Sequence, residues 1–255
     1  MPQTAPLPRT MLLIDTERFS DRDDVQQALL RRMLFSLVDR VLLTAGVDQT
    51  MRLRADRGDA VMELIDPAIP LTTLLRALLT DLPAELRAMN RMAASSTQLR
   101  LRAVLAGGYV AIDEYDGWVG TDLNDACRLL DADPLRAALR ERAGDFVLCV
   151  SESVHAGIVR HQHTGIPAEE FTHITVPTKN GPLPAWLHGP LRPAPPHPAD
   201  AGRGPQPSPS PEPAPATRPA GAAAAGGIEF HGTNHGAIAN QITGGITFGT
   251  PGERR

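Results

Sequence analysis

The chain has 255 residues and a formal net charge of −4, with 42% hydrophobic and 21% charged residues. This balance is typical of a globular protein in water, and the mild charge argues against nucleic acid or an anionic membrane as the main partner. No apolar run approaches the ~20 residues that cross a bilayer, and the N-terminus lacks the apolar core of a signal peptide. We therefore expect a cytoplasmic protein with no membrane span and no nucleic-acid partner.

The composition changes sharply near residue 190, where proline, alanine, glycine and serine begin to dominate. Such a segment buries too little apolar surface to offset its ordering entropy, and its prolines favour an extended spacer. The sequence therefore predicts a disordered N-terminus over 1–9, a folded domain over 10–190, a disordered Pro/Ala-rich linker over 191–227 and a Gly-rich tail over 228–255.

Within the folded domain, apolar residues recur first at strand spacing and then at helical spacing, in alternation. In chain order we expect a strand at 10–15, a helix from 25 that stops at Gly46, and a hairpin of strands 51–55 and 61–65 around a turn at 57–59. A helix over 71–91, which Pro83 kinks or restarts, is followed by strands over 99–115 that are broken at Gly107-Gly108. The remaining elements are a helix over 121–139 capped by Thr121 or Asp122, a strand at 145–150, a short capped helix at 151–161, and strands at 171–177 and 183–189. This order predicts an α+β sandwich, a mostly antiparallel sheet with helices on one face.

Two acids stand at strand ends in this scheme. Asp15 ends the first strand and Asp59 lies in the hairpin turn, so the topology brings the two carboxylates to one edge of the sheet. Carboxylates held close repel each other, and a divalent cation such as Mg²⁺ relieves that repulsion. In the alternative interpretation Asp15 caps the following turn, and Asp59 serves a hairpin in which Gly58 supplies a positive φ.

Three motifs follow one another in a fixed order. They are Asp15 with Phe-Ser four and five residues later in "DTERFS", the Gly58-Asp59 pair in "RGDAVMELI", and Gly120, Asn124 and Arg128 in "GTDLNDACR". This ordered set resembles the catalytic domain of class III nucleotidyl cyclases over about residues 10–190. The resemblance implies a ferredoxin-like cyclase sandwich.

The resemblance also implies an activity and a set of site residues. A cyclase of this family converts ATP or GTP to a 3′,5′-cyclic nucleotide and pyrophosphate, using two Mg²⁺ or Mn²⁺ ions. By analogy Asp15, Asp59 and the Thr16 backbone carbonyl hold the metals, Asn124 orients the ribose, and Arg128 stabilises charge on the reacting phosphate. Family sites lie between two subunits, so the resemblance implies a homodimer with two sites.

Two of the basic residues have a simpler explanation. Arg128 is also placed to form a surface ion pair with an acid at 125, 131 or 133. Lys179, the only lysine of the chain, falls near the position of the family's phosphate-binding lysine, but a loop lysine is more commonly just solvated.

The sequence departs from the family pattern at two positions. Arg18 stands where family members carry a small residue, and Ala55 replaces the lysine that helps to select the base, so the base-binding residues are unknown. Arg54 or Arg57 is a candidate substitute for that lysine. The alternative function is therefore a catalytically silent cyclase-fold nucleotide sensor or scaffold that signals through its C-terminal motif.

The tail has isoleucine and phenylalanine spaced by Gly, Asn and Gln, and "IEFHGTNHG" and "ITFGTPG" form imperfect repeats. It resembles the prion-like, amyloid-forming motifs of some bacterial signalling proteins, which implies a partner protein with a matching motif. A merely disordered tail is the alternative. His161 and His163, alternate histidines without a matched second pair, are interpreted as structural.

Overall fold

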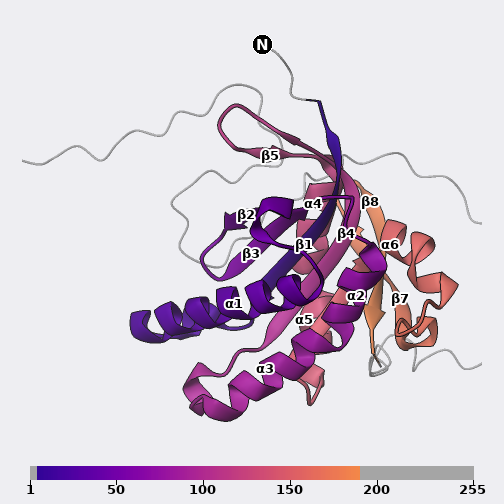
Figure 1. Cartoon of the computed structure of the whole chain (residues 1–255). Coiled ribbons are helices and arrows are strands. Elements are labelled where there is room, and N and C mark those ends of the chain that lie inside the picture. Colours follow the sequence, from indigo (N-terminus) through magenta and orange to yellow (C-terminus); the bar gives the residue numbers. More distant parts are fainter. Residues whose placement is uncertain (1–4, 190–255) are drawn as a thin grey trace, which may run out of the picture. The chain divides into compact units, whose positions relative to one another are not determined.

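The computed structural model describes residues 5–189, whose centre is a twisted β-sheet (Figure 1). In space the strands run β2-β3-β1-β4-β6-β8-β7, and β5 pairs with β4 outside this path. Among the described strands, only the β4–β6 pairing is parallel. The predicted α+β sandwich with a mostly antiparallel sheet is therefore confirmed. The strands are β1 (Leu7–Thr16), β2 (Arg52–Asp56), β3 (Ala60–Ile65), β4 (Leu101–Ile112), β5 (Trp118–Val119), β6 (Phe146–Ser151), β7 (Phe171–Thr178) and β8 (Gly181–His188).

The long first helix begins at a well-formed cap. The Asp23 side chain accepts a hydrogen bond from the Gln26 amide at 2.8 Å, and the Gln26 side chain accepts one from the Asp23 amide at 3.4 Å. The helix then buries an apolar stripe at helical spacing and ends before Gly46, whose φ of 77° suits glycine. Four helices share this first apolar cluster: α1 (Asp24–Thr44), α2 (Leu71–Leu79), α3 (Asp81–Met92) and α6 (Glu152–Gly157).

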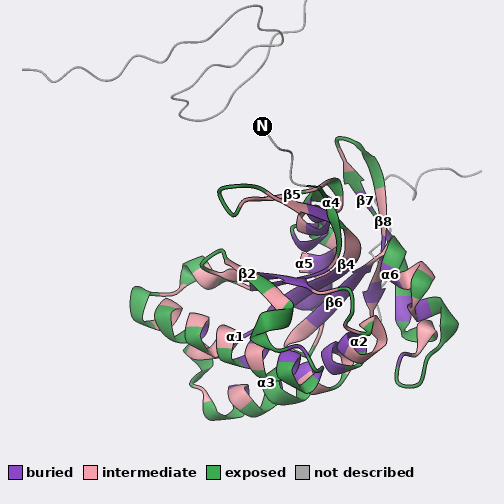
Figure 2. Cartoon of the chain, turned by 45° about the horizontal axis from the view of Figure 1, so that its top comes forward, coloured by how far each residue is buried: buried purple, intermediate pink, exposed green. Residues whose placement is uncertain are grey.

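The helices cover both faces of the sheet, which corrects the prediction that they lie on one face. Leu12 and Ile14 of β1 join the cluster under α1, whereas Met11 and Leu13 join a second cluster under α4 (Thr121–Leu130) and α5 (Asp133–Glu141). Successive strand residues point to opposite faces, so the two clusters lie on opposite sides. Figure 2 shows the buried strands between the two helical layers.

The structure confirms one local prediction and corrects two others. The restart near Pro83 is confirmed, because α2 ends at Leu79 and α3 begins at Asp81. The single helix expected over 121–139 is instead two helices, because Pro134 begins a new first turn in α5. The break expected at Gly107-Gly108 is absent, and β4 runs through both glycines.

Short 3-10 segments complete the described part of the chain: η1 (Phe19–Asp21), η2 (Gln49–Met51), η3 (Ser95–Thr97), η4 (Val159–His161) and η5 (Ala168–Glu170). Within residues 5–189 no helix is both long enough and apolar enough to cross a membrane. The predicted linker over 191–227 and tail over 228–255 lie outside the described residues, as do residues 1–4.

Candidate active site

The fold brings Asp15 and Asp59 to the same end of the sheet. Asp15 pairs with Ala60 across the antiparallel β1–β3 ladder, and the Thr16 amide donates to the Asp59 carbonyl at 3.1 Å. Asp15 at the end of β1 and Asp59 in the β2–β3 turn are therefore close together, although 44 positions separate them in the sequence numbering (59 − 15). Asp15 is buried and Asp59 is half-buried.

Asp15 is an unusual carboxylate because one of its oxygens has no hydrogen-bond partner. Its Oδ2 accepts from Arg102 on β4 at 2.5 Å, whereas its Oδ1 is buried and unpartnered. Burial raises the pKa of Asp15 to about 6; the Arg102 guanidinium opposes this rise and the Asp59 charge adds to it. Arg102 therefore neutralises the negative charge of Asp15 only in part, and a bound cation would neutralise the rest.

Sequence reasoning missed Arg102, which lies 87 positions from its partner. It lies opposite Asp15 in the β1–β4 register and is itself buried, with an unpartnered Nε. The available signal was the pattern "LRLRAVLA", where two arginines interrupt an otherwise apolar strand. A buried arginine in a central strand requires an acid on a neighbouring strand.

The residues present fit a small divalent cation. Asp15 offers a free buried oxygen, Asp59 is adjacent, and the Thr16 backbone lies buried between them in the ladder. Mg²⁺ usually takes one or two protein carboxylates and completes its shell with water and substrate phosphate. No cluster of three or more His, Cys, Asp or Glu side chains suited to a metal occurs in the described range 5–189, so a metal here would need ligands from outside the protein.

The second predicted motif lies on α4, on the same face of the sheet as Asp15. Asn124 is exposed and Arg128, one helical turn later, is half-buried. The N-cap of α4 is Gly120 and not Thr121 or Asp122 as predicted, since both of those residues lie inside the helix. A side chain does not fit at position 120, because a Cβ there would lie 2.5 Å from the Tyr109 carbonyl oxygen. The glycine therefore allows α4 to approach β4.

Asp122 also has a structural task at this junction, since its carboxylate accepts from the Tyr109 amide at 2.7 Å. A Cβ at Gly108 would collide with this same carboxylate group. Two glycines and one aspartate thus fix where α4 begins, and with it the positions of Asn124 and Arg128.

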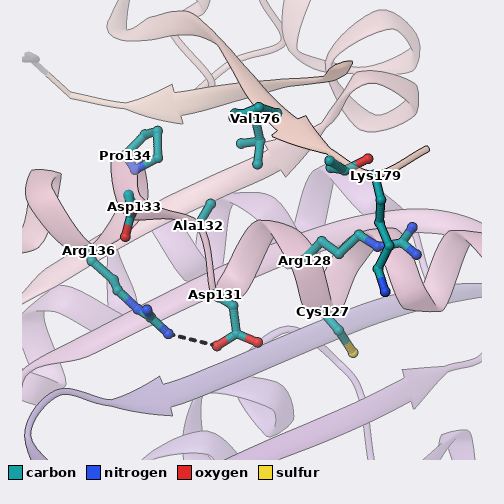
Figure 3. A pocket seen from close by; sticks show the side chains of 11 residues that line it. Cys127, Arg128, Asp131, Ala132, Asp133, Pro134, Arg136, Val176 and Lys179 are labelled. Atoms are coloured by element: carbon teal, nitrogen blue, oxygen red, sulfur yellow. Dashed lines mark hydrogen bonds and ion pairs between the residues drawn. The ribbon is translucent and has the colours of Figure 1, made fainter. Parts of the chain in front are cut away.

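Arg128 and Lys179 line a common cleft of about 720 Å³ between α4, α5 and the β7–β8 turn (Figure 3). In Figure 3 the Arg128 side chain extends from α4 and the Lys179 side chain extends from the β7–β8 turn, and both line this cleft. Arg128 donates to Asp125 at 2.5 Å, so the expected surface ion pair is present, with both partners about a third exposed. Such a pair is weak and exchangeable, and it leaves the arginine available to an anion.

The acidic pair does not join this cleft. Among residues 5–189, no hydrogen bond or ion pair links Asp15 or Asp59 to Asn124 or Arg128, and neither acid lines the cleft. Each chain therefore presents an acidic pair at the end of β1 and a basic pair between α4 and the β7–β8 turn, with no direct contact between the two pairs.

The base-selecting position remains unassigned. Ala55 is half-buried against the second apolar cluster and offers no polar group. Arg54 does not replace the missing lysine, because its guanidinium contacts Glu63 and Asp39 and lies over the Phe35 ring on the opposite face. Arg57, exposed in the hairpin turn, is the remaining candidate.

The two histidines interpreted as structural lie near each other beyond α6. The His161 and His163 rings meet edge to face, with centroids 6.3 Å apart. His161 Nε2 accepts a hydrogen bond from Arg160 at 3.2 Å. These contacts are local and do not involve the site residues.

The architecture is that of known enzymes. The guanylyl cyclase Cya2 superposes with a TM-score of 0.52 at 16% identity, over 75% of this chain and 96% of that one. An adenylate/guanylate cyclase/hydrolase from Silicibacter pomeroyi gives 0.51 at 20% identity, over 73% and 98%. The described domain has the nucleotidyl cyclase fold. A bacterial light-regulated adenylyl cyclase also matches, with a TM-score of 0.52 at 17% identity, over 73% of this chain and 52% of that one.

No family model and no curated protein matches the chain by sequence. At identities of 16–20% the likeness establishes the cyclase fold alone. In this fold Asp15 lies at the end of β1, Asp59 in the β2–β3 turn, and Asn124 and Arg128 on α4.

Proposed function

We propose that this domain is a metal-dependent purine nucleotide cyclase that acts as a homodimer. The observation that carries the proposal is the buried, unpartnered Asp15 oxygen beside Asp59, in a domain with the cyclase fold. This pair has the ligand chemistry of a divalent-cation site that is completed by substrate phosphates.

The reaction is an internal displacement on ATP or GTP. The ribose 3′-hydroxyl releases its proton to solvent, its oxygen forms a bond to the α-phosphorus, the bond from that phosphorus to the bridging oxygen breaks, and pyrophosphate leaves. Two Mg²⁺ or Mn²⁺ ions, held by Asp15, Asp59 and the Thr16 carbonyl, would lower the pKa of the 3′-hydroxyl and neutralise the leaving group.

The chain's own residues supply binding and orientation. Arg128 presents a planar guanidinium to the reacting phosphate, and Asn124 presents an amide to the ribose. Lys179 reaches the same cleft as Arg128 and adds a second positive charge there. Because the acids make no contact with Asn124 or Arg128 of their own chain, two copies are proposed to combine them, each contributing one half of each site.

The direct test is product analysis. The full chain is incubated with ATP, and separately with GTP, plus Mn²⁺ or Mg²⁺, and the products are identified by mass spectrometry. We expect cyclic nucleotide and pyrophosphate from the wild type, loss of both in Asp59→Ala, and retention in Asp24→Ala, a control that removes an exposed acid on α1.

The alternative is a silent nucleotide-binding domain. A folded wild-type protein that binds ATP or GTP but forms no cyclic product with either metal would refute the cyclase proposal. That result would leave nucleotide sensing as the function.

A further inference from the structure

A second cleft lies beside α3 and shares no residue with the candidate active site. Its walls come from the end of α2, from α3, from the segment 142–145 between α5 and β6, and from the end of β8. None of its lining residues lines the cleft of Figure 3 or belongs to the acidic pair. We call it the α3 cleft. Its volume of about 440 Å³ is that of a small-molecule site.

The floor of the α3 cleft is apolar. It consists of Leu79, Pro83, Leu86 and Phe146. Leu86 is a buried member of the first apolar cluster, and Leu79 and Phe146 pack against that cluster while remaining only half-buried. The floor is therefore an open edge of the hydrophobic core, and an apolar group that covers it would remove apolar surface from water.

Two arginines on the walls lack a counter-ion. Arg87 on α3 is exposed, and neither it nor the half-buried Arg142 forms an ion pair within residues 5–189. The Arg142 guanidinium donates through Nη2 to the His188 carbonyl, its Nε is buried without a partner, and burial lowers the pKa of Arg142. Gly189, at φ 88°, makes room for this guanidinium, because a Cβ there would lie 3.0 Å from Nη2.

The two acids that line the same cleft are already engaged elsewhere. Asp145 accepts a hydrogen bond from Asn90 at 2.9 Å and lies 3.6 Å from the Arg100 Nε, and neither of these partners lines the cleft. Glu170 is bonded to the His188 ring at 2.9 Å. The unpaired charge of the α3 cleft is therefore positive.

One wall is fixed in place before any ligand binds. Arg100 donates to the carbonyls of Leu139 at 2.5 Å and of Arg142 and Gly144 at 3.4 Å, and it pairs with Glu17 at 2.8 Å. These bonds tie the segment 142–145 to the start of β4 and to the residue that follows β1. A ligand of this wall would meet a preorganised site, which lowers the entropy cost of binding.

We propose that the α3 cleft binds a small organic anion, a carboxylate on an apolar body, with the carboxylate between Arg87 and Arg142 and the body on the apolar floor. Guanidinium forks bind the two oxygens of a carboxylate in pairs. The acids at the rim, Asp145 and Glu170, repel a doubly charged phosphate more than a singly charged carboxylate. This proposal concerns a site apart from the nucleotide and does not rest on the cyclase activity.

The experiment is calorimetric titration of the metal-free full chain with 4-phenylbutyrate. Two further probes separate its two parts: 4-phenylbutyramide has the same body without the charge, and acetate has the charge without the body. We expect saturable binding of 4-phenylbutyrate, and binding of the amide and of acetate that is at least about tenfold weaker. Equal affinity for 4-phenylbutyrate and its amide would overturn the proposal, as would a wild type that shows no saturable binding of 4-phenylbutyrate.

The deciding variant is Arg87→Gln, which removes an exposed charge on α3 and is not expected to disturb the fold. It should weaken 4-phenylbutyrate binding by about tenfold and leave the amide unaffected. The matched control is Arg32→Gln, an exposed arginine on α1 that does not line the cleft, and it should change the affinity by less than about twofold. Equal losses in the two variants would overturn the proposal.

Two more variants locate the probe. Arg142→Gln should also weaken binding, and Arg142→Lys, which keeps the charge but loses the planar fork, should recover part of the loss. The Arg87 comparison decides the proposal even if the Arg142 variants fold poorly. An affinity that falls in Arg128→Gln but not in Arg87→Gln would place the probe in the cleft of Figure 3 and would overturn the proposal.

Neither metal, nucleotide nor turnover enters this titration, so its failure is separable from a failure of the cyclase proposal. An inactive protein that binds 4-phenylbutyrate through Arg87 retains the α3 cleft as a binding site. An active protein whose 4-phenylbutyrate affinity is unchanged in Arg87→Gln loses it.

Discussion

Lowering the pH from 7 to 5 should weaken divalent-cation binding by about tenfold. The reason is that burial and the Asp59 charge raise the pKa of Asp15 to about 6. A metal binds the ionised carboxylate, and with this pKa the ionised fraction falls from about nine-tenths at pH 7 to about one-tenth at pH 5. An aspartate with an ordinary pKa near 3.9 would remain almost wholly ionised at both pH values.

The assay is a calorimetric titration with Mn²⁺ at pH 5, 6 and 7 in matched ionic strength, without nucleotide. Proton release on binding, measured in buffers of different ionisation enthalpy, should be largest near or below pH 6. The control is Asp59→Asn, which removes one metal ligand and also one cause of the raised Asp15 pKa. Its Mn²⁺ affinity should be lower than that of the wild type and should change less between pH 7 and pH 5. An affinity that is the same at pH 5 and pH 7 would refute the assignment of Asp15 as a titrating ligand.

Three further predictions concern stability. In the metal-free protein the raised pKa of Asp15 contributes stability below pH 4 that is lost as pH rises through about 6, by up to about 3 kcal/mol; chemical denaturation should show this slope in the wild type but not in Asp15→Asn. Gly120→Ala places a Cβ 2.5 Å from the Tyr109 carbonyl and should cost roughly 1–3 kcal/mol, whereas Gly144→Ala, with open space around it, should be near neutral. Arg52→Ala removes a 2.7 Å partner from the fully buried Glu63, which keeps its contact with Arg54, and should cost about 2 kcal/mol; the loss should shrink in a Glu63→Gln background, and an equal loss there would contradict the pairing.

The proximity of Asp15 and Asp59 could be predicted from the sequence, because a hairpin that follows the first helix pairs with the first strand in this topology. The Arg102 partner could not, since the pairing of β1 with β4 depends on the whole sheet order. A charged residue in an apolar strand signals a partner but does not say which one.

The residue pattern of β1 indicated that helices cover both faces of the sheet. Residues 11–14 of β1 are apolar without alternation, and each is at most 1% exposed. An uninterrupted apolar strand is typical of a sheet covered on both faces. The prediction of helices on one face came from the order of the elements, which does not show whether one or both faces of a strand are apolar.

The glycines show why the predicted break in β4 at Gly107-Gly108 was wrong. Gly107-Gly108 is a breaker pair in isolation, yet the strand continues because Asp122 of α4 occupies the space that a side chain at position 108 would need. Gly120 likewise precedes a helix without a capping side chain because it packs on β4. In both cases a tertiary contact, absent from local propensity, decides the residue.

The measurement that tests the account most directly is complementation between two inactive variants. Asp59→Ala and Arg128→Ala proteins are assayed separately with ATP or GTP and Mn²⁺, and then after mixing under conditions that allow subunits to exchange. Each mixed dimer would contain one intact site, so an equal mixture should recover about a quarter of the wild-type cyclic nucleotide production. A wild type that forms no cyclic nucleotide, or a mixture that stays as inactive as its two components although its subunits exchange, would contradict a site shared between the acids of one copy and the arginine of the other.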